Sequence, residues 1–381
     1  MHLTTLNYAQ HEGQPKQWRL NGLSLGPVNL LVGRNAVGKS RTLSIIKGLA
    51  MLLSGTTKLR FITGNYEVVF DNDGQRLEYK LHYEQSKVVS ESFAVDGKQL
   101  LERGDGGAGK IWAERNQLFM DFQTPEDQIA AVTRQDSIQH PFLAPLQQWA
   151  QSLYHYPFGS TLGQDHLGLV VQDSSVPLDP KDPNNVVAIF RRGVKDFREP
   201  FKQSVMDDME FVGFPLRDVD TQTPSSVMIS GPFPSPPVGL CVQERTLDGP
   251  TDQYDMSQGM FRCLSVIIQI TYAQMSSPPG SILIDDIGEG LDHERSCRII
   301  KLLTKKARES KVQLTMATND RFVMNTVPLE EWSVLQRSGG NSRVFNYINS
   351  KPKFDEFKFT GMNNFDFFAT DFLGEDGGKE S

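Results

Sequence analysis

The sequence predicts an α/β fold in which a core of buried strands and helices is interrupted by an antiparallel β subdomain and an inserted, mostly helical subdomain. Three observations support this prediction. Apolar runs at the end of 17–32, at 281–285 and at 312–317 are typical of strands covered on both faces. Residues 61–122 alternate between apolar and polar positions with turn signals between them, which predicts antiparallel strands. From 123 to 238 the pattern becomes largely helical.

Composition and charge limit the class of protein. The chain has 381 residues, 38% of them hydrophobic and 22% charged, as in ordinary globular proteins. Its net charge of −7 argues against a protein coated in basic residues, although it leaves room for a local basic patch. The sequence contains no signal-peptide core and no run of about 18 apolar residues. Cys241, Cys263 and Cys297 fit neither a disulfide framework nor a zinc site, so we expect a cytoplasmic protein without a membrane partner.

The first buried strand leads into “GRNAVGKS” (33–40), and a helical pattern follows it. Glycine at 33 and 38 lets backbone amides approach phosphate oxygens, and the start of a helix presents its positive end there. In this pattern Lys39 reaches the β- and γ-phosphates of a nucleotide, and the Ser40 hydroxyl binds Mg²⁺. A chance match in a glycine-rich turn is the alternative, and the strand–loop–helix context weighs against it.

The middle of the chain changes character near 122. “TPEDQIAAV” begins a helical pattern there, with Thr124 as its expected N-cap and Pro125 at its first position. Residues 173–185 and 221–238 are rich in Pro, Ser and Asp and are expected to form loops. The strand “GLCVQER” then leads back to alternating helices and buried strands.

The buried strand “SILIDD” ends in two adjacent carboxylates. Like charges so close repel each other, and either one is costly to bury without a counter-charge. A bound Mg²⁺ offsets the repulsion if Asp285 holds the ion and Asp286 orients or deprotonates an attacking water. Asp292, in “GLD”, belongs to the next loop.

The segment “MSQGMFR” (256–262) lies before this strand in the chain. Ser257 can cap a helix whose N-terminal amides form an anion site together with Gly259. Taken alone, the segment is better explained by an ordinary helix start. Its place between the phosphate loop and the carboxylate strand favours a functional interpretation.

These four segments resemble, in their order, the motifs of the ATP-binding-cassette (ABC) ATPases: phosphate loop, signature motif, magnesium strand and D-loop. The chain is most similar to the SMC, RecF and OLD (overcoming lysogenisation defect) group, which includes AAA ATPases of prokaryotic defence systems. The resemblance to this group, rather than to transporter ATPases, depends on the antiparallel β insertion after the first helix. The resemblance implies a P-loop NTPase head that binds ATP and Mg²⁺ and closes as a homodimer or higher homo-oligomer through its ATP sites.

The resemblance also implies the roles of individual residues. The nucleotide-binding residues are Gly33, Arg34, Asn35, Ala36, Val37, Gly38, Lys39, Ser40 and Arg41. The implied metal ligands are Ser40 and Asp285, and Asp292 marks the D-loop. The signature residues Ser257, Gln258 and Gly259 of one copy contact the γ-phosphate bound by the other copy.

Three further positions follow from comparison with the family pattern. Asp286 stands where Glu is usual, so the water is held less well and slow turnover is expected. Asn319, in “MATND”, stands where the switch His is usual; its amide can hydrogen-bond a γ-phosphate but carries no charge. Gln123, after “LFMDF”, is the candidate for the Q-loop glutamine, and an ordinary surface glutamine is the alternative.

The expected ABC-type ATPase core comprises 1–60 and 239–350, the antiparallel β subdomain 61–122, and the inserted helical subdomain 123–238. The C-terminal segment 351–381 is rich in phenylalanine, and its glycine-rich end is expected to be disordered. Edge-strand packing would explain most of these aromatic side chains, and exposed members would form a docking surface.

The sequence therefore favours an ATPase that dimerises around ATP and regulates a separate effector, a nuclease or toxin, in anti-phage defence. No nuclease, protease or membrane module is identified in the chain, so the effector is expected to be another protein. A DNA-repair or DNA-clamp ATPase of the RecF and SMC kind is the alternative, for which nucleic acid is the partner. A transporter ATPase is disfavoured by the β insertion and the unusual switch.

Overall fold

The chain divides into two compact units. Unit 1 consists of Met1–Leu153 and Val327–Ser381, and unit 2 of Tyr154–Thr326. This computed structural model describes residues 1–59, 62–169, 178–228, 231–232, 235–370 and 372–373. The sequence predicted more subdomains than these two units, with boundaries at 60, 122 and 238. The two units do not test those boundaries, which stay predictions. No described helix has the length and apolar character needed to cross a membrane.

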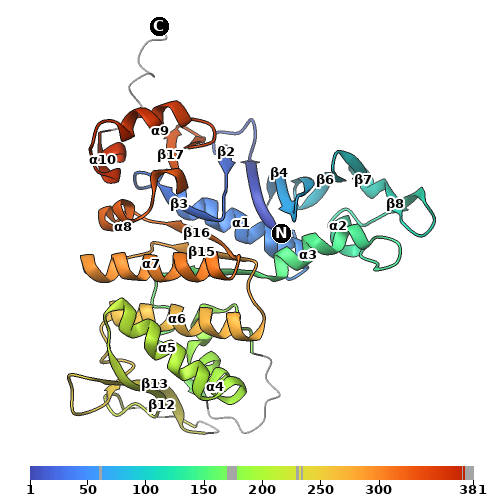
Figure 1. The fold of residues 1–381 in the computed structure, drawn as a ribbon. Helices are drawn as coiled ribbons and strands as arrows, with labels where there is room; N and C mark the ends of the chain where they lie inside the picture. Colours follow the sequence, from blue (N-terminus) through green and yellow to red (C-terminus); the bar gives the residue numbers. More distant parts are fainter. Residues whose placement is uncertain (60–61, 170–177, 229–230, 233–234, 371, 374–381) are drawn as a thin grey trace. The chain divides into compact units, whose positions relative to one another are not determined.

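Unit 1 contains a mixed sheet with the strand order β3-β17-β18-β2-β1-β4-β5-β6-β7-β8-β9 (Figure 1). The β3–β17 and β2–β18 pairs are parallel, whereas the neighbours from β4 to β9 are antiparallel. The antiparallel strands predicted between 61 and 122 are therefore confirmed. The strand bounds are β1 His2–Gln10, β2 Trp18–Ser24, β3 Val28–Val32, β4 Thr63–Asn72, β5 Gln75–Glu84, β6 Lys87–Val95, β7 Lys98–Arg103, β8 Ala108–Ala113, β9 Leu118–Gln123, β17 Trp332–Ser338 and β18 Asn341–Asn346.

Two helices of unit 1 pack against each other and against the sheet. Helix α1 (Lys39–Leu53) buries an apolar face at helical spacing and contacts α3 (Ala144–Gln151). Trp149 of α3 meets Phe70 of β4 edge to face, with ring centroids 4.8 Å apart. The short elements of this unit are η1 Asp105–Gly107, α2 Ala130–Thr133, η2 Pro141–Leu143 and η4 Leu329–Glu331.

The helix predicted from Pro125 is wrong at its start, because α2 begins only at Ala130. The carboxylate of Glu91, on strand β6, accepts hydrogen bonds from the amides of Ala130 and Ala131 at 2.7 and 2.8 Å. Thr124 is therefore not the cap; its hydroxyl oxygen accepts from Arg134 Nε at 3.3 Å instead. A distant strand, and not the local sequence, sets where this helix begins.

The C-terminal segment forms two helices, α9 (Lys351–Lys358) and α10 (Asn364–Ala369), rather than the expected edge strand. Phe354, Phe357 and Phe367 are buried, and the ring centroid of Phe367 lies 4.7 and 4.9 Å from those of Phe354 and Phe357. Phe359, in contrast, is 91% exposed. The expectation of a disordered end falls mainly on 374–381, outside the described residues.

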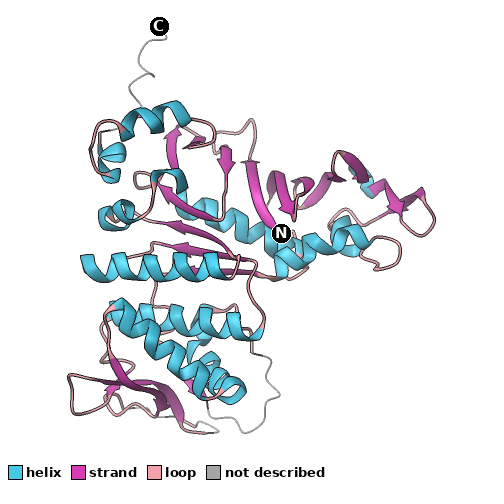
Figure 2. Cartoon of the chain, viewed as in Figure 1, coloured by secondary structure: helices cyan, strands magenta, loops and turns pink. Residues whose placement is uncertain are grey.

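Unit 2 combines sheet strands and helices with a separate antiparallel sheet (Figure 2). Strand β15 lies between β10 and β16 and is parallel to β16, and helix α6 packs against α4 and α5. The second sheet has the order β11-β13-β12, with β14 beside β13, so the inserted region holds strands as well as helices. The bounds are β10 Leu153–Pro157, β11 Gly168–Leu169, η3 Pro183–Asn185, α4 Val186–Phe197, α5 Glu199–Val212, β12 Leu216–Gln222, β13 Pro237–Glu244, β14 Thr251–Asp252, α6 Gln258–Ser276, β15 Ser281–Asp285, α7 His293–Glu309, β16 Gln313–Ala317 and α8 Arg321–Thr326.

Candidate nucleotide-binding site

The predicted phosphate loop lies between the fully buried strand β3 and helix α1 of unit 1. Gly38 stands at the N-cap of α1 with φ 113°, a left-handed conformation, and no side chain caps the helix there. A Cβ on Gly38 would lie 2.9 Å from a ring carbon of Trp18, so only glycine fits this position. Helix α1 therefore begins at a glycine that cannot cap it, and its N-terminus presents the positive end of the helix dipole to an anion.

Lys39 is buried, and its ammonium group donates to the carbonyl oxygens of Gly33 at 2.8 Å and Arg34 at 3.3 Å. The lysine thus folds over its own loop and holds a positive charge at the site where phosphates would bind. Two residues of the neighbouring strands brace the loop from outside. Arg337 Nη1 donates to Ala36 O at 3.0 Å, and the Ser342 hydroxyl to Val37 O at 2.7 Å. The loop is preformed, and the sequence analysis did not identify these two braces.

Arg41 stacks on Trp18, with its guanidinium carbon 4.2 Å from the ring centroid. Trp18, on β2, is 1% exposed and also lies against Gly38. The cation–π contact gives Arg41 a packing role beside the phosphate loop. Its contact with nucleotide stays a prediction.

A cavity of about 260 Å³ lies beside the phosphate loop within unit 1. Arg34 and Val37 line it from the loop, and Arg337 from β17. Phe367 and Phe368 of α10 close it on the C-terminal side. The C-terminal segment therefore borders the phosphate loop.

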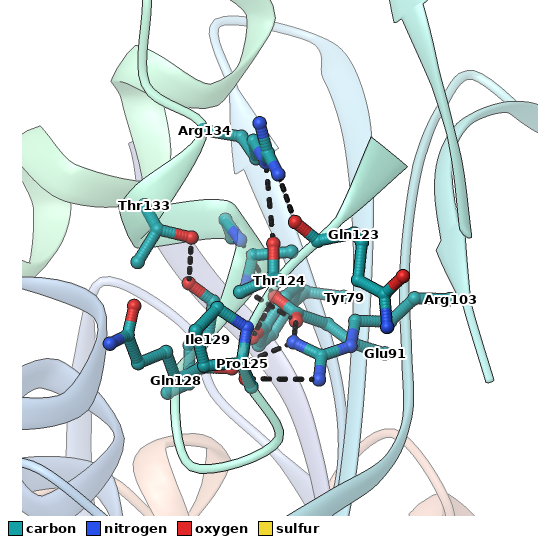
Figure 3. Close-up of polar contacts among 12 residues, drawn as sticks. Tyr79, Glu91, Arg103, Gln123, Thr124, Pro125, Gln128, Ile129, Thr133 and Arg134 are labelled. Atoms are coloured by element: carbon teal, nitrogen blue, oxygen red, sulfur yellow. Dashed lines mark hydrogen bonds and ion pairs between the residues drawn. The ribbon is translucent and has the colours of Figure 1, made fainter. Parts of the chain in front are cut away.

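The structure does not bring Gln123 to the phosphate loop. Gln123 ends β9, the strand at the opposite end of the unit 1 sheet from β3, and its side-chain amide donates to Gly106 O at 3.1 Å. Figure 3 shows it next to a buried polar group formed by Tyr79, Glu91 and Arg103. The surface-glutamine alternative fits this position, and Gln123 has no part in the proposal below.

This polar group, Tyr79–Glu91–Arg103, ties three neighbouring strands to the loop before α2 (Figure 3). The Glu91 and Arg103 side chains are both 0% exposed, and the nearest atoms of the pair are 3.7 Å apart. The Tyr79 hydroxyl donates to Glu91 at 3.0 Å, and Arg103 donates to Gln128 O at 2.7 Å. Burial raises the pKa of Glu91, while the Ala130 and Ala131 amides and Arg103 act in the opposite direction.

We expect Glu91→Ala to destabilise the protein by about 3–5 kcal/mol, because it leaves the Arg103 charge buried without its counter-charge. Urea unfolding followed by circular dichroism measures the loss, and Glu102→Ala, an exposed position on adjacent β7, is the matched control. The double variant Glu91→Ala/Arg103→Met should recover part of the stability. Equal stability of Glu91→Ala and the control would contradict this role for the pair.

The carboxylate pair of unit 2 lies at the end of β15, as predicted, and the two residues differ in backbone conformation. Asp285 is the last residue of the strand, and its carbonyl accepts from the amide of Phe158 at 2.9 Å. Asp286 has φ 52°, in the left-handed region, which Asp tolerates better than most residues. A Cβ on Gly159 would lie 3.0 Å from Asp286 Cβ and 3.2 Å from its Oδ2. The loop after β10 thus lies directly against Asp286, a contact that the sequence analysis missed.

The predicted switch residue Asn319 follows β16, the parallel neighbour of β15. The two strand ends are tied by Ile287 N donating to Ala317 O and Thr318 Oγ1 donating to Ile287 O, both at 3.0 Å. Asp320 accepts from the amides of Phe322 and Val323 at 2.6 and 3.1 Å and so caps α8. The structure therefore brings Asn319 and the carboxylate pair to the same end of this sheet.

The signature segment begins α6, with Ser257 at the N-cap accepting from Met260 N at 3.3 Å and Gln258 as the first helical residue. A Cβ on Gly259 would lie 2.6 Å from Gly290 O, so the signature helix packs against the D-loop of its own chain. Asp292 caps α7, accepting from Arg295 N at 3.0 Å, and this backbone hydrogen bond holds its pKa below the usual value. Ser257 is a helix cap, as predicted; its contact with nucleotide stays a prediction.

Arg262, which the sequence analysis did not single out, joins the elements of this site in unit 2. It lies on α6 and is 8% exposed. It donates to Ser160 O at 2.9 Å, Gly159 O at 3.0 Å and Glu289 O at 2.9 Å. One side chain thus holds the loop beside Asp286, the D-loop and the signature helix together. An arginine in the mainly apolar run “MFRCLSVII” was the signal that could have identified it.

We expect Arg262→Gln to lower the ATP turnover number about 10- to 100-fold with little effect on ATP affinity, the usual cost of losing a supporting residue. Steady-state phosphate release and equilibrium ATP binding separate the two quantities. Arg298→Gln on α7, whose side chain is half exposed, is the matched control. A fall in ATP affinity without a fall in turnover would contradict the positioning role.

Comparison with known proteins agrees with this geometry. A family model described as “AAA domain, putative AbiEii toxin, Type IV TA system” matches residues 28–325. No curated protein matches the chain. An SMC head crystallised with the C-winged helix domain of ScpA is similar in fold, with a TM-score of 0.53 at 11% identity over 91% of this chain and 98% of that one. This likeness confirms the predicted α/β head of the ABC type.

Two further SMC heads are similar at lower scores. The head domain from Thermotoga maritima is 12% identical, with 91% of this chain and 99% of that chain covered and a TM-score of 0.46. A head with an extended coiled coil, bound to the C-terminal domain of ScpA derived from Pyrococcus furiosus, is 10% identical. It covers 94% of this chain and 99% of its own, with a TM-score of 0.48.

Proposed function

Because the chain belongs to the AAA-domain family whose description names the AbiEii toxin and type IV toxin–antitoxin systems, we propose that it binds and hydrolyses ATP. The observation that carries the proposal is the preformed phosphate loop. Buried Lys39 already donates to Gly33 O at 2.8 Å, and Arg337 and Ser342 donate to the loop carbonyls of Ala36 and Val37 before α1 begins. A loop held in this way binds phosphates at little cost in ordering.

In the proposed complex the phosphates lie on the backbone amides of 34–40, and Lys39 turns from its own carbonyls to the β- and γ-phosphates. Ser40 and Asp285 would hold Mg²⁺, and both offer the oxygen donors that this ion prefers. Within the described residues no group of three or more His, Cys, Asp or Glu side chains could hold a metal ion. That fits an ion bound together with nucleotide, because Mg²⁺ usually takes one or two carboxylates and completes its shell with phosphates and water. When bound, Mg²⁺ would neutralise negative charge on the phosphate oxygens.

Asp286 would orient the attacking water and accept its proton, and the amide of Asn319 would hydrogen-bond the γ-phosphate. The short Asp side chain holds the water less well than the usual Glu, so turnover is slow. Arg262 acts through the loop that lies against Asp286 and is a positioning residue.

Two copies would close around ATP, with Ser257, Gln258 and Gly259 of one copy on the γ-phosphate bound by the other. The resemblance to ABC ATPases and the position of Ser257 at the N-terminus of α6, the positive end of the helix, support this arrangement. Arg262, by donating to Glu289 O, holds the D-loop next to the signature helix in each copy. Closure is then the signal, and hydrolysis resets it.

We infer that closure controls a separate effector, a nuclease or toxin, in anti-phage defence. The family description, which names a toxin and toxin–antitoxin systems, supports this inference. A DNA-clamp ATPase is the second candidate, and the likeness to an SMC head favours it.

Two experiments test these proposals in turn. The purified chain is mixed with ATP with and without Mg²⁺, and phosphate release is measured; no release above the level of a Lys39→Ala variant would overturn the ATPase. Co-purification from the native host, followed by mass spectrometry, then distinguishes the two roles. A stable second protein supports the effector role. Recovery of the ATPase alone, with ATP-stimulated and steeply salt-dependent DNA binding, supports the clamp.

A further inference from the structure

Strand β9 (Leu118–Gln123) is the outermost strand of the unit 1 sheet, and it is exposed on both faces. Leu118, Phe119 and Met120 are 49%, 48% and 43% exposed. Edge strands of natural proteins are usually protected by a lysine, a proline, a bulge or a covering segment. The strand “LFMDFQ” has neither lysine nor proline, and its pairing with β8 runs without a bulge.

The pairing with β8 determines which backbone groups of β9 point outward. Thr124 N donates to Gly107 O, and on the other side of β8 Gly104 N donates to Ala108 O. Because backbone groups alternate along an antiparallel strand, the even-numbered residues 118, 120 and 122 bond to β8. The amide and carbonyl groups of Phe119 and Asp121 therefore point away from the sheet.

Arg134 limits the length of this open edge. Its guanidinium donates to Gln123 O and lies over the ring of Phe122, 5.2 Å from the centroid. The outward carbonyl of Gln123 therefore already accepts a hydrogen bond from Arg134. The edge available for pairing is 118–122, with four outward backbone groups on Phe119 and Asp121.

We propose that this edge pairs with the same edge of a second copy of the chain, antiparallel about a two-fold axis at Met120. Phe119 of each copy then bonds with Asp121 of the other, forming four backbone hydrogen bonds across the axis. The pairing is isologous, as most dimer contacts are. It is independent of nucleotide and separate from closure around ATP.

The side chains of β9 are complementary to themselves in this register. On one face Met120 meets Met120 of the second copy, and Leu118 meets Phe122, so every contact is apolar. On the other face Asp121, the single charged residue of the strand, lies opposite Phe119 of the second copy. A pairing centred on Asp121 would set the two Asp121 carboxylates against each other and would also require the Gln123 carbonyl that Arg134 holds. A pairing centred on Phe119 would place Asp121 opposite Gln117, which precedes the strand and has φ 54°. A net charge of −7 per copy opposes self-association elsewhere more than at this nearly uncharged edge.

The first test is the mass of the full chain without nucleotide, measured by sedimentation velocity at micromolar concentration. The wild type is expected to be a dimer. Asp121→Pro removes an outward amide without removing a bond to β8, so its dimer should dissociate at least about tenfold more readily. Asp121→Asn keeps the amide and is the matched control, which should remain dimeric. A monomeric wild type, or equal effects of the two variants, would overturn the proposal.

The second test checks the register by oxidative cross-linking. Residues directly opposite in a non-hydrogen-bonded pair have Cα atoms about 4.5 Å apart, within disulfide range. Met120→Cys should therefore form a cross-linked dimer. Leu118→Cys should not, since the two copies of residue 118 are about 13 Å apart along the strands. Wild type controls for cross-linking through the partly exposed Cys297. Cross-linking of Leu118→Cys alone would overturn the register, and failure of both variants to cross-link would overturn the β9 contact.

Both tests are repeated with Lys39→Ala, which should still form the β9 dimer. A dimer that persists there without ATP binding separates this contact from the proposed ATPase. A dimer that needs Lys39 and ATP would instead be the nucleotide-bridged one, and would overturn the β9 contact.

Discussion

The Asp286→Asn variant is expected to bind ATP and Mg²⁺ as the wild type does and to hydrolyse ATP about 10²- to 10⁴-fold more slowly, the usual contribution of a general base. Asn has the size of Asp and tolerates the left-handed backbone at this position, so the fold should be unchanged. The variant is expected to lose one step only, because the Asn amide cannot accept the proton from the attacking water. Single-turnover phosphate release at saturating ATP measures it, and ATP-bound dimers should accumulate.

The neighbouring carboxylate is expected to behave differently. Asp285→Asn should weaken Mg²⁺-dependent ATP binding, because this residue is assigned to the metal, and titration with Mg²⁺ at fixed ATP measures the shift. Glu289→Gln, an exposed side chain in the same loop, is the matched control and should change neither quantity. Equal loss of metal dependence in the Asp285 and Asp286 variants would show that the two roles are wrongly divided.

The Lys39→Ala variant is expected to lose ATP affinity about 100-fold or more, because charge-assisted hydrogen bonds to two phosphates disappear. Equilibrium binding of a fluorescent ATP analogue measures the loss. Lys39→Met fills the buried volume left by the alkyl chain and should lose the same affinity, which separates charge from packing. Lys47→Ala, further along α1, controls for a general charge effect. Unchanged affinity in both Lys39 variants would refute the phosphate-loop assignment.

Features formed by neighbours in the sequence could be predicted. Alternation with period two predicted the hairpins from β4 to β9, since each strand pairs with the next through a short turn. The helix after the phosphate loop and the cap at Ser257 likewise depend on contacts within a few residues. The carboxylate pair was recognisable because two adjacent charges rarely end an apolar strand without a ligand.

Features formed between distant segments could not be predicted. Gln123 follows an apolar strand just as a Q-loop residue would, but its place depends on the order of strands in the sheet, which no local pattern encodes. Helix α2 starts where Glu91 caps it from another strand. Arg262 acts on residues about a hundred positions away, and its hydrogen bonds became visible only in the folded chain.

The hydrogen-bond partners of Arg262 determine which substitutions around this site would leave its hydrogen bonds intact. All three of its hydrogen bonds end on main-chain carbonyls, at Gly159, Ser160 and Glu289. Every amino acid carries that carbonyl, so substitutions at 160 and 289 leave the bonds chemically intact. Only Gly159 is further restricted, by its closeness to Asp286. The geometry of this site therefore depends on the arginine and on glycines packed close to the site, Gly159 against Asp286 and Gly290 against Arg262, whereas the side chains at 160 and 289 can change without loss of these hydrogen bonds.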